Sequence, residues 1–256
     1  MLVVVDIGNT NITIGLFRGD DLIANYRLTT LAKRTSDEYG FLITSFLNNE
    51  HIKPSDVQDV IIASVVPKIM YSFNNSIRKY FKKEPIIVGP GIKTGISIRI
   101  DNPRDLGADR LVDAVAAYYI HKGNVLVIDF GTATTFDYIN EKGEFVGGVT
   151  SPGIEIGAQA MAAKAAKLPE IEIKASPGVL ATNTIDSMQA GVYFGYIGHT
   201  EYIIKKFKET VSSDLKVVAT GGLGRIIAEN TEMIDVYDQD LTFKGLKMIY
   251  DRTKKG

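Results

Sequence analysis

LVVVDIGNTN at residues 2–11 and VLVIDFGTATT at residues 125–135 are the stretches that decide the fold of this sequence. In each, a run of apolar, mostly β-branched residues predicts a buried strand that ends at an aspartate, and a glycine follows two positions later. Asp6 in the first stretch matches Asp129 in the second, 123 positions further along a chain of 256 residues. A repeat at about half the chain length predicts two similar domains rather than one.

The residues around each copy predict the same succession of elements. In the first half we expect strands at 2–5, 12–17, 22–28, 60–66 and 85–88, and helices at 35–47 and 67–81. In the second half we expect strands at 125–129, 135–139, 144–149 and 216–220, and helices at 154–167 and 184–211. Thr35 and Glu38 have the spacing of a capping box, which marks a helix start. Strands and helices in this order are typical of an α/β layered domain.

The position of the repeat also predicts where the domains divide. We expect a first domain over residues 1–120 and a second over residues 121–256, with the C-terminal helix packing back on the first domain. Each domain has enough residues to bury a core of its own.

Composition excludes several classes of site and partner. The chain has 29 basic and 30 acidic residues, a formal net charge of −1, which gives no electrostatic case for binding nucleic acid or an anionic membrane. With no cysteine it cannot form disulfides, thiolate zinc sites or thiol nucleophiles, and its three histidines lack HExxH spacing. The longest apolar run, VIIASVV at 60–66, is far shorter than the roughly 18 residues of a membrane span. We therefore expect a cytoplasmic protein with a small-molecule partner.

The repeated turn after each aspartate has the chemistry of a phosphate clamp. Its glycine lets the backbone approach a ligand, and N–H groups and hydroxyls of the Asn and Thr residues that follow can surround phosphate oxygens. The aspartate suits Mg²⁺, which is commonly held by few carboxylates together with phosphates and water. Two such turns facing one another across a cleft would hold a polyphosphate. The alternative is a pair of ordinary hairpin turns rich in Asn, Gly and Thr.

A third motif, NPRDLGADRLVDAVAAYYIH at 102–121, predicts a helix with Asp109 and Arg110 in its first turn. Helix N-termini favour anions, so Arg110 can pair with a carboxylate or phosphate, and Asp109 can accept a proton from a nucleophile. A first-turn acid with a salt-bridged arginine and no catalytic role is the alternative.

The glycine motifs of other nucleotide-binding folds are missing from the sequence. No Walker or Rossmann pattern is present, and GPGIKTG at 89–95 lacks the P-loop spacing. The glycines at 221, 222 and 224 follow a strand and form either a corner for a base or sugar or a purely structural turn.

Six motifs together resemble, in order and spacing, the type III pantothenate kinases of the acetate and sugar kinase/Hsp70/actin superfamily. They are DIGNTN (6–11), LGADR (106–110), DFGTATT (129–135), GGVTSPG (147–153), NTIDSMQAG (183–191) and ATGG (219–222). The resemblance implies two duplicated actin-like, ribonuclease H-like domains, each a mixed sheet with flanking helices, and a cleft between them. It also implies ATP-dependent phosphorylation of pantothenate to 4′-phosphopantothenate, the first step towards coenzyme A, by a cytoplasmic homodimer that uses Mg²⁺ with ATP and K⁺ or NH₄⁺.

The resemblance further implies roles for single residues. ATP phosphates and Mg²⁺ would be held by Asp6, Ile7, Gly8, Asn9, Thr10, Asn11, Ile12 and Thr13, with Thr132 completing the nucleotide clamp. Pantothenate would be bound by Gly107, Ala108, Asp109, Arg110 and Thr184, with Asp109 as the catalytic proton acceptor. Asp129 would bind the monovalent cation. Many family members carry Tyr two residues before the Asn-Pro of the third motif, where this chain has Ile100, so the rim of the pantothenate pocket departs from the family pattern.

Two other functions are compatible with these residues. A sugar kinase or other small-alcohol kinase of the same superfamily would share the phosphate motifs, and only residues 89–110 and 182–191 would select its substrate. A nucleotide-binding regulator would keep the fold without turnover. The presence of both Asp6 and Asp109 argues against the regulator, because a sensor needs no base.

Overall fold

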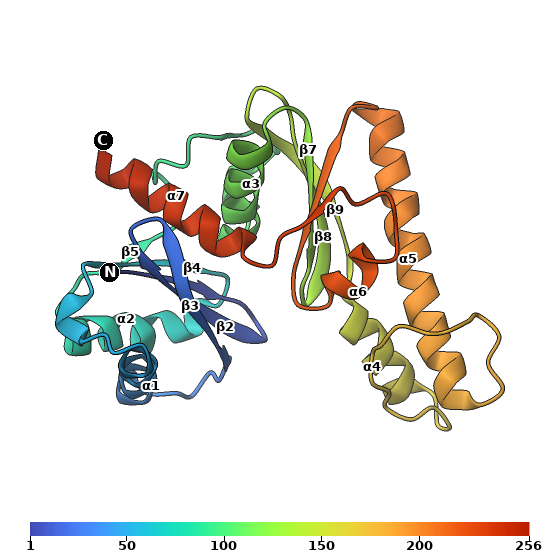
Figure 1. The fold of residues 1–256 in the computed structure, drawn as a ribbon, viewed down its shortest axis with the longest axis horizontal. Coiled ribbons are helices and arrows are strands. Elements are labelled where there is room, and N and C mark those ends of the chain that lie inside the picture. Colours follow the sequence, from blue (N-terminus) through green and yellow to red (C-terminus); the bar gives the residue numbers. More distant parts are fainter. Residues whose placement is uncertain (256) are drawn as a thin grey trace. The chain divides into compact units, whose positions relative to one another are not determined.

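The computed structural model describes residues 1–255, which form two compact α/β units (Figure 1). Unit 1 combines Met1–Gly95, Asn102–Ala116 and the chain from Leu241 onwards, and unit 2 combines Ile96–Asp101 with Ala117–Asp240. The chain therefore leaves unit 1 and returns to it with its C-terminal segment. No helix in the described part of the chain is long and apolar enough to cross a membrane.

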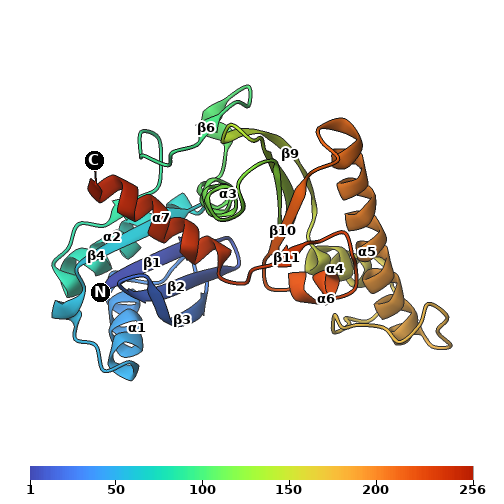
Figure 2. The same ribbon diagram turned by 45° about the horizontal axis from the view of Figure 1, so that its top comes forward.

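Unit 1 is built on a mixed sheet that, within the described residues, has five strands in the order β3-β2-β1-β4-β5. They are β1 (Leu2–Ile7), β2 (Asn11–Arg18), β3 (Asp21–Thr29), β4 (Asp59–Ser64) and β5 (Ile86–Ile87). Val3, Val5 and Ile7 of β1 share one core with residues of α1 (Ser36–Asn49) and α2 (Pro67–Phe81). α7 (Leu241–Lys255) lies against the other face of the sheet, as Figure 2 also shows. On this face the side chains of Val4 and of Phe243 in α7 both approach Gly15. Because side chains alternate along a strand, Asp6 lies on the α7 face with Val4.

Unit 1 also contains two short 3-10 helices among its described residues. η1 (Pro54–Asp56) precedes β4, and η2 (Pro103–Asp105) precedes α3 (Ala108–His121). The division between the two units falls inside α3, after Ala116.

Unit 2 is built on a mixed sheet whose six described strands have the order β11-β10-β7-β8-β9-β6. They are β6 (Ser97–Ile98), β7 (Val125–Phe130), β8 (Ala133–Ile139), β9 (Glu144–Pro152), β10 (Lys216–Thr220) and β11 (Val236–Tyr237). Besides the end of α3, the described helices of unit 2 are α4 (Ile154–Lys164), α5 (Thr184–Thr210) and α6 (Gly224–Ala228). Leu126, Ile128 and Phe130 of β7 share a core with residues of α4 and α5. Asp129 alternates with them and therefore lies on the opposite face of the sheet.

The two sheets repeat one connectivity. The order β3-β2-β1-β4-β5 corresponds to β9-β8-β7-β10-β11, and β6 adds a strand beyond β9. β1 and β7 hold the same place, each with an antiparallel neighbour on one side and a parallel neighbour on the other. The prediction of a duplicated α/β domain from the repeated sequence is confirmed.

Most predicted elements are present but differ at their ends, and two short strands are additional. The strand expected at 144–149 continues as β9 to Pro152, and the helix expected over 154–167 ends at Lys164. The strand expected at 85–88 is reduced to Ile86–Ile87. β6 and β11 were not predicted, because strands of two residues have no alternation to detect.

α1 begins with the predicted capping box. Thr35 Oγ1 accepts a hydrogen bond from Glu38 N at 3.3 Å, and Glu38 Oε2 accepts one from Thr35 N at 2.6 Å. The hydrogen bond from Thr35 N to the Glu38 carboxylate, and after it the bond from Thr35 Oγ1 to Glu38 Oε2 at 2.9 Å, lower the pKa of the Glu38 carboxyl.

Thr35→Ala is expected to lower the free energy of unfolding by about 1 kcal/mol, the usual effect of losing an N-cap side chain. Urea denaturation measures the change, and Thr35→Ser, which keeps the hydroxyl, should remain close to wild type. An unchanged urea midpoint for Thr35→Ala would show that this cap does not stabilise the fold.

Candidate active site

Asp6 and Asp129 occupy equivalent places in the two sheets. Each is the last residue but one of its strand, β1 or β7. In the register Asp6 lies opposite Thr13, and Asp129 lies opposite Thr135. Directly opposite residues point to the same face of a sheet, so each carboxylate has a threonine hydroxyl beside it. Such oxygen-rich surroundings suit a hard cation.

The turn after β1 is fixed by a hydrogen bond within it and by two from Thr30, the residue that follows β3. Gly8 N donates to Asn11 O at 2.9 Å. Thr30 donates twice, from its N to Thr10 O at 2.9 Å and from its Oγ1 to Gly8 O at 2.7 Å. Asn9 and Thr10 are exposed at the tip of this turn. Residues 8–11 therefore have a defined conformation beside Asp6.

The turn after β7 is supported by the start of α4. Gly131 and Thr132 are exposed, and Gly153 N donates to Thr132 O at 3.2 Å. A Cβ at Gly153 would lie 2.3 Å from Thr132 O and 2.5 Å from Gly131 O, so only glycine allows this approach. The last residue of the GGVTSPG motif thus holds the second turn in place.

The end of β10 completes the surroundings of Asp129. β10 is parallel to β7 and places Thr220 next to Asp129. Gly221 follows with a φ of +96°, and a Cβ there would lie 2.6 Å from Asp129 Oδ1. Tyr237 Oη donates to Gly221 O at 2.8 Å and fixes this corner. Both the backbone conformation and the contact with Asp129 require glycine at 221.

Asp109 lies at the same end of the unit 1 sheet as Asp6. Asp109 and Arg110 are half-buried in the first turn of α3, as the sequence predicts, and Asp109 Oδ1 accepts from Arg110 N at 2.7 Å. A Cβ at Gly107 would lie 2.5 Å from Asp109 Oδ1 and 3.4 Å from Val65 Cγ1. Val65 follows β4, and its N donates to Ile7 O at 3.1 Å. The carboxylate of Asp109 is thereby placed near the ends of β1 and β4.

Other elements position Thr184 and Ile100. Thr184 is the exposed first residue of α5, whose N-cap Asn183 accepts from Asp186 N at 3.0 Å. Ile100 is half-buried in the segment after β6, which belongs to unit 2. Within unit 1 the structure therefore brings together Asp6, residues 8–11 and Asp109, and within unit 2 it brings together Asp129 and the turn that contains Thr132.

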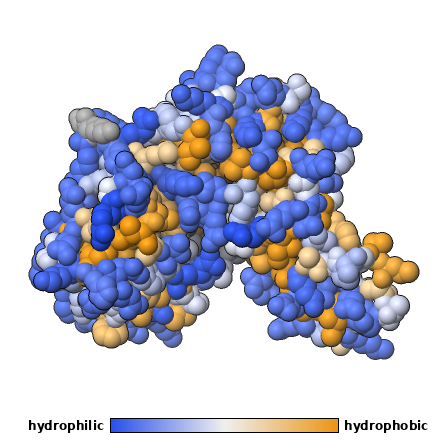
Figure 3. All heavy atoms as spheres, viewed as in Figure 1, coloured by the Kyte–Doolittle hydropathy of each residue, from blue (hydrophilic) through white to orange (hydrophobic). Residues whose placement is uncertain are grey.

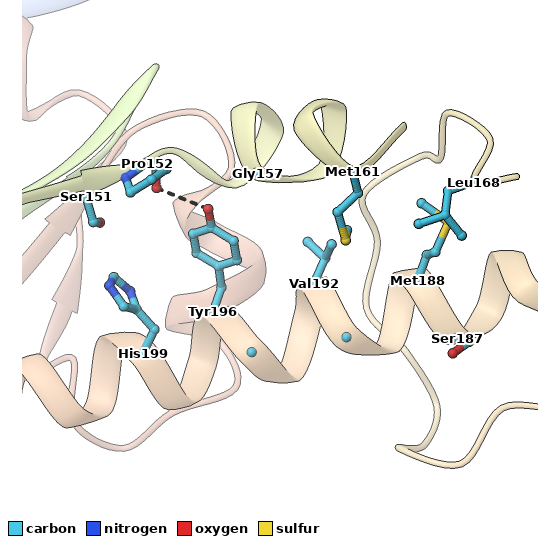
Figure 4. Close-up of a pocket in the computed structure, with 12 residues that line it drawn as sticks. Ser151, Pro152, Gly157, Met161, Leu168, Ser187, Met188, Val192, Tyr196 and His199 are labelled. Carbon is cyan, nitrogen blue, oxygen red and sulfur yellow. Dashed lines mark hydrogen bonds between the residues drawn. The ribbon is translucent and has the colours of Figure 1, made fainter. Parts of the chain in front are cut away.

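A pocket of about 660 Å³ lies between α4 and α5, on the face of the unit 2 sheet opposite Asp129 (Figure 4). At one end Tyr196 Oη donates to Pro152 O at 3.1 Å and to Gly153 O at 2.8 Å. Burial raises the pKa of Tyr196 and lowers that of His199, so both side chains are neutral near pH 7. None of the predicted site residues is among the described residues that line this pocket. Its apolar wall is formed by Met161, Leu168, Met188 and Val192.

Comparison with known proteins connects these features with one family. The family model described as type III pantothenate kinase matches residues 2–206, more than half of the chain. The chain belongs to the type III pantothenate kinase family. A type III pantothenate kinase of Agathobacter rectalis is 56% identical over 256 residues, which cover 100% of this chain and 98% of the relative. The resemblance predicted from the motifs is confirmed.

Solved structures share the fold of this family member at low sequence identity. A Campylobacter jejuni protein assigned to the Baf family of transcriptional activators has a TM-score of 0.62 and 21% identity, covering 99% of this chain and 100% of its own. MreB 5 of Spiroplasma citri, bound to AMPPNP, has a TM-score of 0.55 and 11% identity, covering 99% and 97%. At these identities they show the fold alone. The predicted α/β class with two actin-like domains is confirmed.

Sequence reasoning missed two supporting residues of this candidate site, Gly153 and Tyr196. Gly153 is the last residue of the GGVTSPG motif, which contributes to the family resemblance but indicates no role for this glycine. Tyr196 lies on α5 in a stripe with Val192 and His199 that is typical of a core face. Only the fold shows that Tyr196 bonds to Gly153, which in turn supports Thr132.

Proposed function

We propose that this protein transfers the γ-phosphoryl group of ATP to the primary hydroxyl of pantothenate and so forms 4′-phosphopantothenate, the first step of coenzyme A biosynthesis. Membership of the family over the whole chain, at 56% identity to the A. rectalis protein, carries the proposal. Phosphoryl transfer depends mainly on alignment and on neutralising charge. Oxygen-rich turns and a nearby carboxylate therefore suffice, without cysteine or a histidine metal site.

We assign the nucleotide phosphates to the two turns. In unit 1 the proposed ligands are Asp6 and residues 7–13, and in unit 2 the proposed ligand is Thr132. The three hydrogen bonds that fix the first turn support this assignment, because a preorganised turn loses little freedom on binding phosphate. The carboxylate of Asp6 beside Thr13 fits Mg²⁺, which when bound supplies the positive charge that a Walker lysine supplies in other folds.

We assign Asp109 as the base. As the bond between the pantothenate oxygen and phosphorus forms and the bond to ADP breaks, the Asp109 carboxylate accepts the hydroxyl proton and becomes a neutral acid. The transition state is loose and the proton leaves late, so an ordinary carboxylate can serve. The hydrogen bond from Arg110 N to Asp109 Oδ1 orients the carboxylate.

The substrate contacts are proposed on the same helix start. Gly107 and Ala108 would line the pantothenate site, and Arg110 would pair with the pantothenate carboxylate, because its guanidinium matches a carboxylate with two parallel bonds. Thr184 would add a contact from the start of α5.

We assign the monovalent cation to Asp129. Thr135 Oγ1 lies on the same face of the sheet, is buried, and has no hydrogen-bond partner within the described residues. A buried hydroxyl oxygen without a partner calls for an explanation, and beside a carboxylate it fits a cation coordinated by oxygen. K⁺ or NH₄⁺ at this place would offset phosphate charge.

A steady-state assay with K⁺ and Na⁺ tests both the function and the cation assignment. Purified protein with ATP, Mg²⁺ and pantothenate in K⁺ is expected to release ADP and to form 4′-phosphopantothenate. Na⁺ in place of K⁺ is expected to lower kcat by about tenfold or more, equal to about 1.4 kcal/mol of transition-state stabilisation. Absence of product in both K⁺ and NH₄⁺ would contradict the function. Equal rates in K⁺ and Na⁺ would contradict only the role of Asp129.

The homodimeric state and the cytoplasmic location that the resemblance implies stay predictions. Exposed apolar residues in unit 2 support the dimer. Val179 is 79% exposed, Leu180 is 91% exposed and Ile185 is 50% exposed. Figure 3 shows apolar spheres over the region of α4 and the chain that leads to α5, at the lower right. Apolar patches of this kind on a protein surface often mark an association site.

A further inference from the structure

α7 is anchored to the sheet of unit 1 along its length. Phe243, near the start of the helix, lies against β2, where a Cβ at Gly15 would be 3.1 Å from Phe243 Cδ1. Further along, Tyr250 Oη donates to Asp59 Oδ2 at 2.7 Å, and Lys254 pairs with the same carboxylate at 3.2 Å. Burial is the main cause that raises the pKa of Tyr250, so its hydroxyl remains a donor at neutral pH. The helix therefore has a fixed position on the sheet that carries Asp6.

The same helix contacts α3 directly. Thr242 Oγ1 donates to Asp113 Oδ1 at 2.7 Å, across 129 positions of sequence. Asp113 is only 3% exposed. One turn later, a Cβ at Gly245 would lie 2.2 Å from Val112 O, a backbone atom of α3. The glycine lets the two helices touch, and the hydrogen bond to a buried carboxylate fixes how they lie against each other.

These contacts affect the proposed base, Asp109, because residues four apart lie on the same side of an α-helix. Asp113 lies one turn after Asp109, on the same side of α3. The N-terminal end of α3 is held at Gly107 against Val65, and its second turn is held by Thr242. These two contacts, at Gly107 and Asp113, lie on either side of the first turn of α3 and fix the position and rotation of this turn, which carries Asp109 and Arg110.

We propose that Thr242 and Asp113 are positioning residues for phosphoryl transfer, and that α7 holds Asp109 and Arg110 in their reactive places through them. The C-terminal helix α7 then helps to shape the part of the active site in which pantothenate accepts the phosphoryl group. The inference rests on the proposed function, because it assigns these residues to the reaction of Asp109.

Thr242→Val and Tyr250→Phe form a matched pair that tests the proposal. Each removes one α7 hydroxyl that donates to a carboxylate, but the carboxylate of Thr242 is Asp113 on α3, whereas that of Tyr250 is Asp59 on β4. Thr242→Val is expected to raise the KM for pantothenate, lower kcat and reduce kcat/KM by roughly 10- to 100-fold, as when catalytic groups shift by about 1 Å. The KM for ATP should stay close to wild type. Tyr250→Phe should retain both pantothenate parameters, and Thr242→Ser should restore them.

The KM for pantothenate distinguishes a positioning role of Thr242 from a loss of activity that is due only to less folded protein. A smaller active fraction lowers the apparent kcat but leaves KM unchanged. Equal kinetics for Thr242→Val and Tyr250→Phe, or a change in apparent kcat alone, would overturn the proposal.

Hydrogen exchange gives a second readout that needs no substrate. The amides of residues 107–113 are expected to exchange faster in Thr242→Val than in Tyr250→Phe, because local opening of the first turn becomes easier. Equal exchange in the two variants would overturn the positioning role whatever the substrate is. Wild-type protein that leaves pantothenate unchanged would overturn the proposed function instead, and exchange would then decide on the positioning role alone.

Discussion

Asp109→Asn will lower kcat for pantothenate phosphorylation by roughly 10²- to 10⁴-fold, the range found when a general base is removed. The amide keeps an Oδ1 atom that can accept from Arg110 N, the bond seen at 2.7 Å, so the first turn of α3 should be preserved. ATP affinity should stay close to wild type, because the phosphates are assigned to other residues. Single-turnover kinetics measure the chemical step, and calorimetry measures ATP binding.

Asp105→Asn is the matched control for this prediction. Asp105 is exposed in η2, four residues before Asp109, and its Oδ1 accepts from Asn102 Nδ2 at 2.8 Å. The Asp105→Asn substitution removes the same charge from the same segment as Asp109→Asn and should leave kcat unchanged. A rate for Asp109→Asn close to that of Asp105→Asn would exclude Asp109 as the base.

Gly153→Ala is expected to raise the KM for ATP by roughly tenfold or more, because displacing a binding group by about 1 Å can cost 10²-fold. The added Cβ would lie 2.3 Å from Thr132 O and 2.5 Å from Gly131 O, and both are backbone atoms that must move. The KM for pantothenate should change less, because the atoms nearest to the added Cβ belong to Gly131 and Thr132 and not to the residues proposed to bind pantothenate. Steady-state kinetics with each substrate varied in turn measure the difference.

Gly178→Ala controls for the effect of adding a methyl group to unit 2. A Cβ at Gly178 would meet no described heavy atom within 4 Å, so this substitution should leave both KM values near wild type. Equal KM values for ATP in Gly153→Ala and Gly178→Ala would contradict the assignment of the second turn to the nucleotide.

The duplication could be predicted because its signal is local in the sequence. An apolar run, an aspartate and a glycine occur together within a few residues at both Asp6 and Asp129, and each stretch predicts its own strand and turn. The first turn of α3 is also local, since Asp109 and Arg110 precede a regular helical stripe. These parts of the candidate site needed no knowledge of tertiary contacts.

The supporting contacts could not be predicted because they join distant parts of the chain. Thr242 and Asp113 lie 129 positions apart, and nothing near either residue indicates the other. Gly153 appears in the sequence as one more turn glycine, and only its distance to Thr132 O shows why no other residue fits. Tyr196 is similar, because an aromatic residue on a helix predicts a core position rather than a bond to a backbone carbonyl.

A competition between acceptors tests the assignment of pantothenate most directly. The protein is incubated with ATP, Mg²⁺ and K⁺ and with equal concentrations of pantothenate and a set of sugars, and the phosphorylated products are identified by mass spectrometry. 4′-Phosphopantothenate is expected to accumulate while the sugars remain unchanged. A sugar phosphate formed in the presence of unchanged pantothenate would contradict the assignment.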